Sequence, residues 1–265
     1  MLRSVLKKLA TSVLVSSGST AIRGGLLKGR LLPHSIASTN LAMVCGRYET
    51  EIQQVLSQEA IGCQVTYDIG AHVGFFSLLF ADVTGDHGIV IAFEPSVSEA
   101  DRVKELIQCN RLQNRVILER MAVCDEVAEL TFYAGSASFT GILDKVSKPG
   151  HHENQTSVIV QGITLDEYVY GHENPPPDFM KIDVEAAEAS VIRGASRLLA
   201  EKRPKMLIEV HGPNPCRDTV ELILSHKYCV DYLGPDGHVR VTQPDQLRDQ
   251  FWKGKWTNHL LAVPC

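Results

Sequence analysis

The strongest constraint on the fold is an alternation of strand-like and helix-like segments that begins near Tyr48. The predicted strands are Val65–Ile69, Ile89–Phe93, Val116–Ala122, Leu130–Tyr133, Val158–Ile163, Phe179–Ile182 and Met206–Val210. The predicted helices are Glu51–Leu56, Val73–Ala81, Ser98–Asn110 and Ala186–Leu199, with a polar loop over residues 135–155. This alternation predicts an α/β fold, with a mostly parallel sheet and helices on both faces. Ligands of such sheets bind beyond the carboxyl ends of the strands, where the strand order reverses.

Composition sets broad limits on function. The 265 residues suffice for one large domain, and the net charge of −5 gives no basic surface for nucleic acid. We therefore expect no nucleic-acid partner. The seven cysteines form no C-x-x-C pair, so we expect neither a zinc site nor a disulfide framework. Most cysteines are expected to be buried thiols of a cytoplasmic protein.

The first 45 residues differ from the rest because they are basic and contain no acid. Apolar residues fall there at helical spacing, at Leu2, Val5, Leu6, Leu9 and Val13. This segment is too short to span a membrane, so it is interpreted as a helix docked on the domain. A basic amphipathic helix in weak contact with an anionic membrane surface, or an organelle transit peptide, stays open. We divide the chain into a helical extension, 1–45, and one domain, 46–265.

The stretch VTYDIGAHVGFF raises a specific question, because a strand that looks buried ends in Asp68 and opens onto Gly70 and Gly74. The spacing is not the G-x-G-x-x-G of a diphosphate cradle, which disfavours a nicotinamide-dependent oxidoreductase. The next strand ends at Glu94, where a carboxylate can accept both hydroxyls of a ribose. Together these acids favour a nucleoside with a cationic amino-acid tail, and S-adenosylmethionine fits. A simple tight turn remains the structural alternative for the glycines.

Several motifs in order resemble the FkbM family of S-adenosylmethionine-dependent methyltransferases. They are GRYE before a helix, DIGAHVG, FEPS, ITLDEYV, FMKIDVEAAEASVIRGASRLL, RPKMLIEVHG and the terminal HLLAVP. The likeness runs from about Gly46 to the C-terminus. It implies a Rossmann-like class I methyltransferase fold with a mixed, mostly parallel, seven-stranded sheet. It also implies O-methylation of a sugar, polyketide or other small metabolite.

The resemblance assigns cofactor contacts to particular residues. The set is Glu49, Asp68, Gly70, His72, Gly74, Glu94, Ala122 and Asp183. Asp68, Gly70 and Gly74 are expected at the methionine part and Glu94 at the ribose. Ala122 is expected along the adenine, with plain core packing as its alternative.

Three residues are candidates for catalysis: Asp183, Glu185 and His211. Asp183 and Glu185 follow one strand, and a carboxylate there can take a proton from an alcohol or orient it. His211 follows the next strand and is the one candidate whose ordinary pKa lies near neutrality, although it could instead hold a turn. Glu209 is expected at the substrate. Glu188 is interpreted as an acid favoured by the N-terminus of its helix.

Other expectations concern metal, turnover and acceptor. Asp183, Glu209 and His211 could hold magnesium, but two acids and a histidine make a poor octahedral site, so no metal is expected. Ala186 stands where the family usually has glycine, which either strains a turn or narrows the acceptor pocket. A protein that binds the cofactor without catalysis therefore stays open. The acceptor is expected to be a small molecule or glycan, walled by the loop 135–155 and by Trp252 and Trp256. The sequence patterns indicate neither which molecule is the acceptor nor the oligomeric state.

Overall fold

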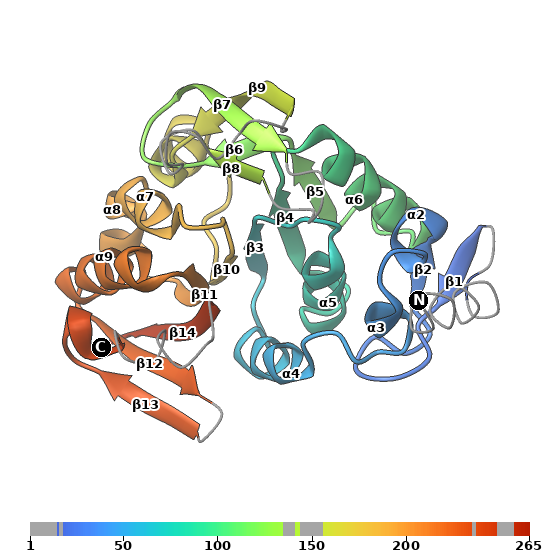
Figure 1. The fold of residues 1–265 in the computed structure, drawn as a ribbon, viewed down its shortest axis with the longest axis horizontal. Coiled ribbons are helices and arrows are strands. Elements are labelled where there is room, and N and C mark those ends of the chain that lie inside the picture. Colours follow the sequence, from blue (N-terminus) through green and yellow to red (C-terminus); the bar gives the residue numbers. More distant parts are fainter. Residues whose placement is uncertain (1–14, 16–17, 135–140, 144–155, 235–236, 248–256) are drawn as a thin grey trace, which may run out of the picture.

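The computed structural model describes residues 15, 18–134, 141–143, 156–234, 237–247 and 257–265 (Figure 1). The apolar residues of the predicted N-terminal helix, most of the loop 135–155, and both tryptophans lie outside the described residues.

The main sheet has eight strands among the described residues, where seven were expected. In order across the sheet they are β13 (Gly237–Val241), β12 (Tyr228–Gly234), β14 (Thr257–Pro264), β11 (Lys205–His211), β10 (Phe179–Ile182), β3 (Val65–Ile69), β4 (Ile89–Phe93) and β5 (Val116–Glu119). The five strands from β11 to β5 run parallel, and β14 runs antiparallel between β11 and β12. The extra strand is β13, which forms a hairpin with β12 and is mostly exposed at the sheet edge.

Helices cover both faces of the sheet, as predicted (Figure 1). One face carries α7 (Glu188–Arg193), α8 (Ser196–Glu201) and α9 (Pro213–Ser225), and the other carries α4 (Thr50–Glu59), α5 (Phe75–Val83) and α6 (Val97–Cys109). Each face buries its own hydrophobic core. The single helix predicted over 186–199 is wrong, because it breaks at Gly194 and Ala195, and glycine is a weak helix former.

A second sheet of four strands has the order β6 (Met121–Val123), β9 (Thr156–Ile163), β7 (Ala128–Ala134) and β8 (Gly141–Leu143). The single strand predicted over 116–122 is therefore two strands in two sheets. The chain turns out of the main sheet after Glu119, and β6 then pairs with β9. This change of sheet carries Met121 and Ala122 toward the carboxyl ends of the parallel strands. The short turn Glu167–Gly171 (η2) follows β9.

The described residues before Tyr48 form β1 (Ser19–Ala21), β2 (Leu31–Pro33), α2 (His34–Ala37) and α3 (Leu41–Val44). Their apolar side chains, such as Ile22, Leu32 and Val44, belong to the same core as α5 and α6. Arg30 also forms an ion pair with Asp82 of α5. This packing fixes the position from which Tyr48 and Glu49 reach the sheet.

The cysteines differ from expectation. Cys229 and Cys265 form a disulfide, because β12 and the end of β14 are paired neighbours although the two residues are 36 apart in the chain. Among the described residues the other five cysteines take part in no disulfide, and of these only Cys124 and Cys216 are fully buried.

A short 3-10 helix, η3 (Pro244–Leu247), follows β13. Across the described part of the chain, every helix is too short or too polar to cross a membrane.

Candidate functional site

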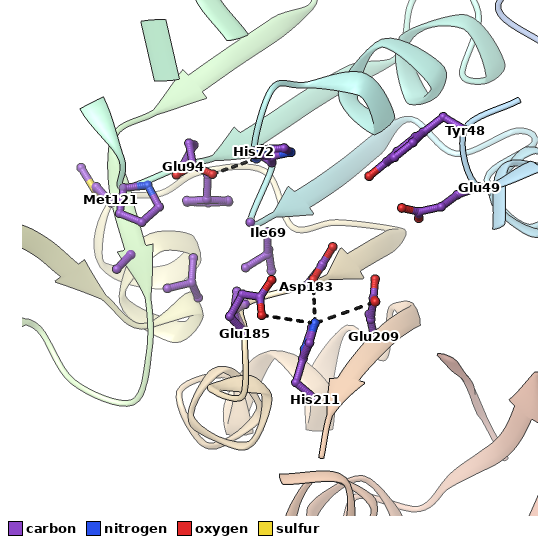
Figure 2. Close-up of a pocket in the computed structure, with 16 residues that line it drawn as sticks. Tyr48, Glu49, Ile69, His72, Glu94, Met121, Asp183, Glu185, Glu209 and His211 are labelled. Atoms are coloured by element: carbon purple, nitrogen blue, oxygen red, sulfur yellow. Dashed lines mark hydrogen bonds and ion pairs between the residues drawn. The ribbon is translucent and has the colours of Figure 1, made fainter. Parts of the chain in front are cut away.

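A cavity of about 240 Å³ opens at the carboxyl ends of the parallel strands (Figure 2). It lies where the strand order reverses, between β3 and β10, as the sequence predicted. Its walls come from the ends of β3, β4, β10 and β11, from β6, and from the segment before α4. Of the residues predicted from sequence, it brings together Glu49, Gly70, His72, Glu94, Ala122, Asp183, Glu185, Glu209 and His211.

Gly70 is required by close backbone packing. It has a φ of +81°, and a Cβ there would lie 1.9 Å from the carbonyl oxygen of Asp183. Only glycine lets the loop after β3 touch the loop after β10 in this way. The glycine therefore brings two strand ends together at the floor of the cavity.

Asp68 and Gly74 do not line the cavity. Asp68 is fully buried beneath it and accepts a hydrogen bond from the Ser77 hydroxyl at 2.5 Å. It also lies beside Lys181 on the neighbouring strand, and the two charges interact. A Cβ on Gly74 would instead meet Val103 and Leu106, so this glycine lets α5 and α6 pack closely.

Lys181 is a buried cation that the sequence analysis did not single out. Its Nζ lies 2.9 Å from Asp183 Oδ2 and 4.9 Å from the centre of the Phe76 ring. Burial opposes its charge, but Asp183 and Asp68 raise the pKa of Lys181 above its ordinary value. Lys181 thus compensates the negative charge of Asp68, which lies outside the cavity lining, and that of Asp183, which lines the cavity.

Glu94 is fixed by backbone donors. His72 N donates to Glu94 Oε2 at 2.8 Å, and Ser96 N donates to Oε1 at 2.9 Å. Each oxygen keeps a lone pair for a further donor. Burial raises the pKa of Glu94 to about 8, and it also lowers the pKa of the His72 side chain to about 4.

Tyr48 and Glu49 line the cavity on the other side of Asp183 from Glu94 (Figure 2). One oxygen of Glu49, Oε2, is buried and has no hydrogen-bond partner within the described structure. Burial raises the pKa of Glu49, whereas Tyr48 and Lys181 lower it. A buried acceptor without a donor is costly, so this oxygen is suited to a cationic or hydrogen-bonding ligand.

His211 stands at the centre of a ring of carboxylates (Figure 2). Its side chain is 6% exposed, and its Nε2 lies 3.7 Å from Asp183 Oδ1, 3.6 Å from Glu185 Oε2 and 3.8 Å from Glu209 Oε1. Asp183 and Glu185 come from the loop after β10, and Glu209 and His211 come from β11. The structure therefore brings the predicted catalytic residues into one group.

Glu188 belongs to this group and was missed as a functional residue. It is fully buried, and its Oε1 lies 2.7 Å from His211 Nδ1. The same oxygen accepts the backbone N–H of Ala186 at 3.0 Å. Burial lowers the pKa of His211, but Glu188 and the other carboxylates outweigh it and raise that pKa to about 9. The available signal was the acid three residues after Glu185, together with the histidine that ends the next strand.

The loop after β10 carries two consecutive residues in the left-handed region, Glu185 with a φ of 51° and Ala186 with a φ of 72°. The position where the family usually has glycine therefore does require positive φ. Holding alanine there costs about 1 kcal/mol or more. This turn aims Glu185 at the cavity and presents the Ala186 N–H to Glu188.

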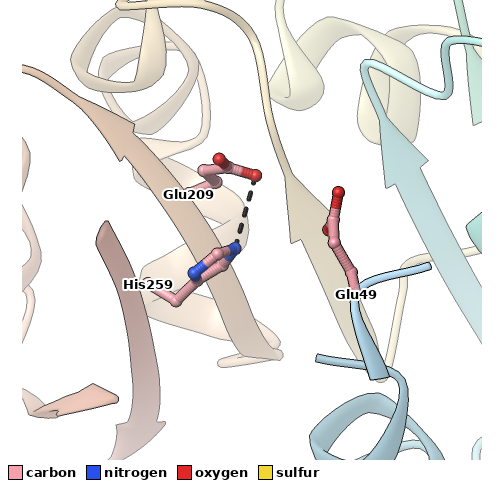
Figure 3. Close-up of side chains that lie close together, drawn as sticks. All are labelled: Glu49, Glu209 and His259. Atoms are coloured by element: carbon pink, nitrogen blue, oxygen red, sulfur yellow. Dashed lines mark ion pairs between the residues drawn. The ribbon is translucent and has the colours of Figure 1, made fainter. Parts of the chain in front are cut away.

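Two sets of three side chains have the spacing of metal ligands among the described residues: Asp183, Glu209 and His211, and Glu49, Glu209 and His259. The shared member, Glu209, lies 3.3 Å from His259 through its Oε2 (Figure 3). Burial raises the pKa of Glu209, but His259 outweighs it and lowers that pKa to about 2. Asp183 is held by Lys181 and His211 by Glu188, so the first set already has protein partners.

Comparison with known proteins identifies the family. The profile described as "Methyltransferase FkbM domain" matches residues 68–233, more than half of the chain. Hexuronic acid methyltransferase AglP of Haloferax volcanii is 27% identical over 181 residues, which are 68% of this chain and 70% of that protein.

Solved structures that are similar to this chain include two methyltransferases at low sequence identity. The FkbM methyltransferase of Methylobacillus flagellatus has 15% identity and a TM-score of 0.48, over 98% of this chain and 59% of that one. This chain therefore spans less than two thirds of that protein. An O-methyltransferase of Bacillus cereus in complex with SAH has 15% identity and a TM-score of 0.47, over 81% of this chain and 79% of that one. We rest the family assignment on the profile match.

The sheet order and the cavity at its reversal are those of a Rossmann-like class I methyltransferase fold, and the matched family uses S-adenosylmethionine as its methyl donor. The chain belongs to the FkbM methyltransferase family. The residues present fit that cofactor. Glu94 has lone pairs free for ribose hydroxyls, and the unpartnered Glu49 Oε2 suits a cationic amino group. Met121 and Ala122 offer an apolar wall for a base.

Proposed function

We propose that the protein transfers the methyl group to a hydroxyl oxygen of a sugar, glycan or other small metabolite. The observation that carries this proposal is the geometry of His211. Glu188 holds its Nδ1 at 2.7 Å, and its Nε2 faces the cavity among Asp183, Glu185 and Glu209. A histidine held in this way by a buried carboxylate is suited to accept a proton through its other nitrogen.

In the proposed reaction, Asp183, Glu185 and Glu209 orient the acceptor hydroxyl toward His211. S-adenosylmethionine, when bound, supplies a methyl group that needs no further activation. Glu188 keeps a proton on His211 Nδ1, so Nε2 is the nitrogen that accepts the hydroxyl proton. The imidazolium that forms is stabilised by Glu188 and by the surrounding carboxylates.

We expect Glu49, Gly70, His72, Glu94, Ala122 and Asp183 to contact the cofactor. Glu94 accepts the ribose hydroxyls, and Ala122 lies along the adenine. Asp68 and Gly74 act from outside the cavity, because Asp68 anchors α5 through Ser77 and Gly74 seats α5 against α6. Their contribution to cofactor binding is therefore indirect.

The charge of the cavity favours a neutral hydroxyl over a carboxylate as the methyl acceptor. Four carboxylates line the cavity, from Glu49, Asp183, Glu185 and Glu209. An acceptor carboxylate placed among them would be repelled, whereas a hydroxyl can donate to any of them.

The test is methyl transfer from S-adenosylmethionine labelled in its methyl group to hexoses and hexuronic acids. A methyl ether survives alkaline hydrolysis, whereas a methyl ester releases labelled methanol. We expect label that survives alkali, and its loss in His211→Asn with the affinity for S-adenosylhomocysteine retained. Released methanol would refute hydroxyl methylation. Cofactor binding with no transfer to any acceptor would favour the binding-protein alternative.

A further inference from the structure

A groove of about 850 Å³ lies beside the cavity, between α4 and the strands β12, β13 and β14. It is several times larger than the cavity at the strand ends, which measures about 240 Å³. Side chains that line it include Gln54, Gln58, Tyr232, His238, Thr257 and His259.

The groove adjoins the cavity at Glu49, Glu209 and His259, whose side chains lie close together (Figure 3). Glu49 lines both of them. His259 lines the groove, and its Nε2 lies 3.3 Å from Oε2 of Glu209, which lines the cavity. The side chains of Glu49 and His259 therefore stand between a ligand in the groove and the carboxylates around His211. In contrast, the other residues expected to hold the cofactor, such as Gly70 and Glu94, line only the cavity.

The groove is polar in a way that suits hydroxyl groups. Gln54 and Gln58 are exposed on one face of α4, and each amide offers both donors and an acceptor. His238 and Thr257 add further donors and acceptors from the opposite wall. Apolar side chains are few in the described lining, namely Ile52, Val55 and Leu233. This lining disfavours a hydrophobic aglycone.

We propose that this groove binds the non-reacting rings of an oligosaccharide acceptor, whose terminal ring points past Glu49 and His259 toward the cavity. This inference rests on the proposed function and narrows its acceptor to a chain of more than one sugar ring. The size of the groove and its amide and hydroxyl groups on two walls support it. A single ring would occupy the cavity and leave the groove empty.

The experiment measures kcat/KM for methyl transfer to a single hexose and to hexose oligosaccharides of two and four rings. Gln54→Trp fills the groove from an exposed helix position that does not line the cavity. Lys104→Trp is the matched control, because Lys104 is exposed on α6 and lines neither space. We expect Gln54→Trp to lower kcat/KM for the four-ring acceptor by about tenfold or more and to leave the one-ring acceptor within about twofold.

The affinity for S-adenosylhomocysteine separates the two levels of inference. If the wild-type protein does not bind it, the proposed function itself fails. If the wild type binds it but methylates no oligosaccharide better than a single ring, the groove proposal is refuted. Equal losses for long and short acceptors in Gln54→Trp, or no loss for either, would also refute it. Lys104→Trp should match the wild type throughout.

Discussion

The pH profile of methyl transfer depends on the contact between Glu188 and His211. If His211 is the base, it must be neutral, whereas Glu188 and the other carboxylates raise its pKa to about 9. At pH 7 only about one molecule in a hundred then has a neutral His211. We expect kcat/KM to rise about tenfold per pH unit from pH 7 and to level off near pH 9.

Substitution of Glu188 tests this contact directly. In Glu188→Gln the amide oxygen can still accept from His211 Nδ1, but the negative charge is gone. The midpoint of the profile should therefore move to lower pH, with the plateau rate largely kept. Glu188→Ala removes the acceptor as well, so its plateau rate should fall by about 10-fold to 100-fold. The assay is methyl transfer at saturating cofactor from pH 6 to 10.

Folding stability gives an independent readout of the same contact. The pKa of His211 is raised on folding, so its stabilisation is complete below pH 6.5 and is lost as the pH rises through about 9. A difference of one unit between the folded and unfolded pKa corresponds to about 1.4 kcal/mol in the free energy of unfolding. The contribution of His211 to that free energy is therefore at most about 3 kcal/mol. Urea unfolding at pH 6 and pH 9.5 should show this loss in the wild type and not in His211→Asn. A rate that falls with rising pH, or an unchanged midpoint in Glu188→Gln, would refute the assignment.

Three further predictions concern the cofactor, the turn after β10, and metal. Burial raises the pKa of Glu94 to about 8, so calorimetry should show S-adenosylhomocysteine binding that tightens as the pH rises from 7 to 9. Glu94→Gln should abolish this trend and weaken binding at least about tenfold, whereas the exposed Glu126→Gln should change neither. Ala186→Gly should relieve the strain of the positive φ at this position and raise the melting temperature by about 1–3 °C, without a change in cofactor affinity. A lower melting temperature would show that alanine is not strained there. Asp183, Glu209 and His211 already have protein partners, so dialysis against EDTA should leave the rate unchanged, and restoration of a lost rate by Mg²⁺ would contradict this.

Much of the fold followed from local pattern. The strands Val65–Ile69, Ile89–Phe93 and Phe179–Ile182 are confirmed at the predicted residues, because each is a short apolar run bounded by polar or turn residues. The C-terminal hairpin of β12 and β13 was missed, since β13 is only five residues long and is largely exposed at the sheet edge. The strands β5 and β6 were predicted as one strand over 116–122, because no residue type in this segment marks the change from one sheet to the other.

The candidate site shows a similar division. Strand-end residues such as Glu94 and Asp183 could be placed from sequence, because the ends of parallel strands meet at one edge of the sheet. Asp68 could not be placed, since sequence does not tell whether an acid at a strand end points into the cavity or under it. The pairing of Glu188 with His211 joins residues 23 apart and depends on how α7 packs against β11.

The placement of β14 has a consequence for how the molecule is completed during synthesis. This strand is the last of the described elements in the chain, yet it lies inside the sheet, between β11 and β12. Until it leaves the ribosome, both of these strands have an open edge with unpaired N–H and C=O groups. His259, the partner of Glu209, arrives with it. The insertion of β14 therefore closes the sheet and brings Glu209 its partner in the same step.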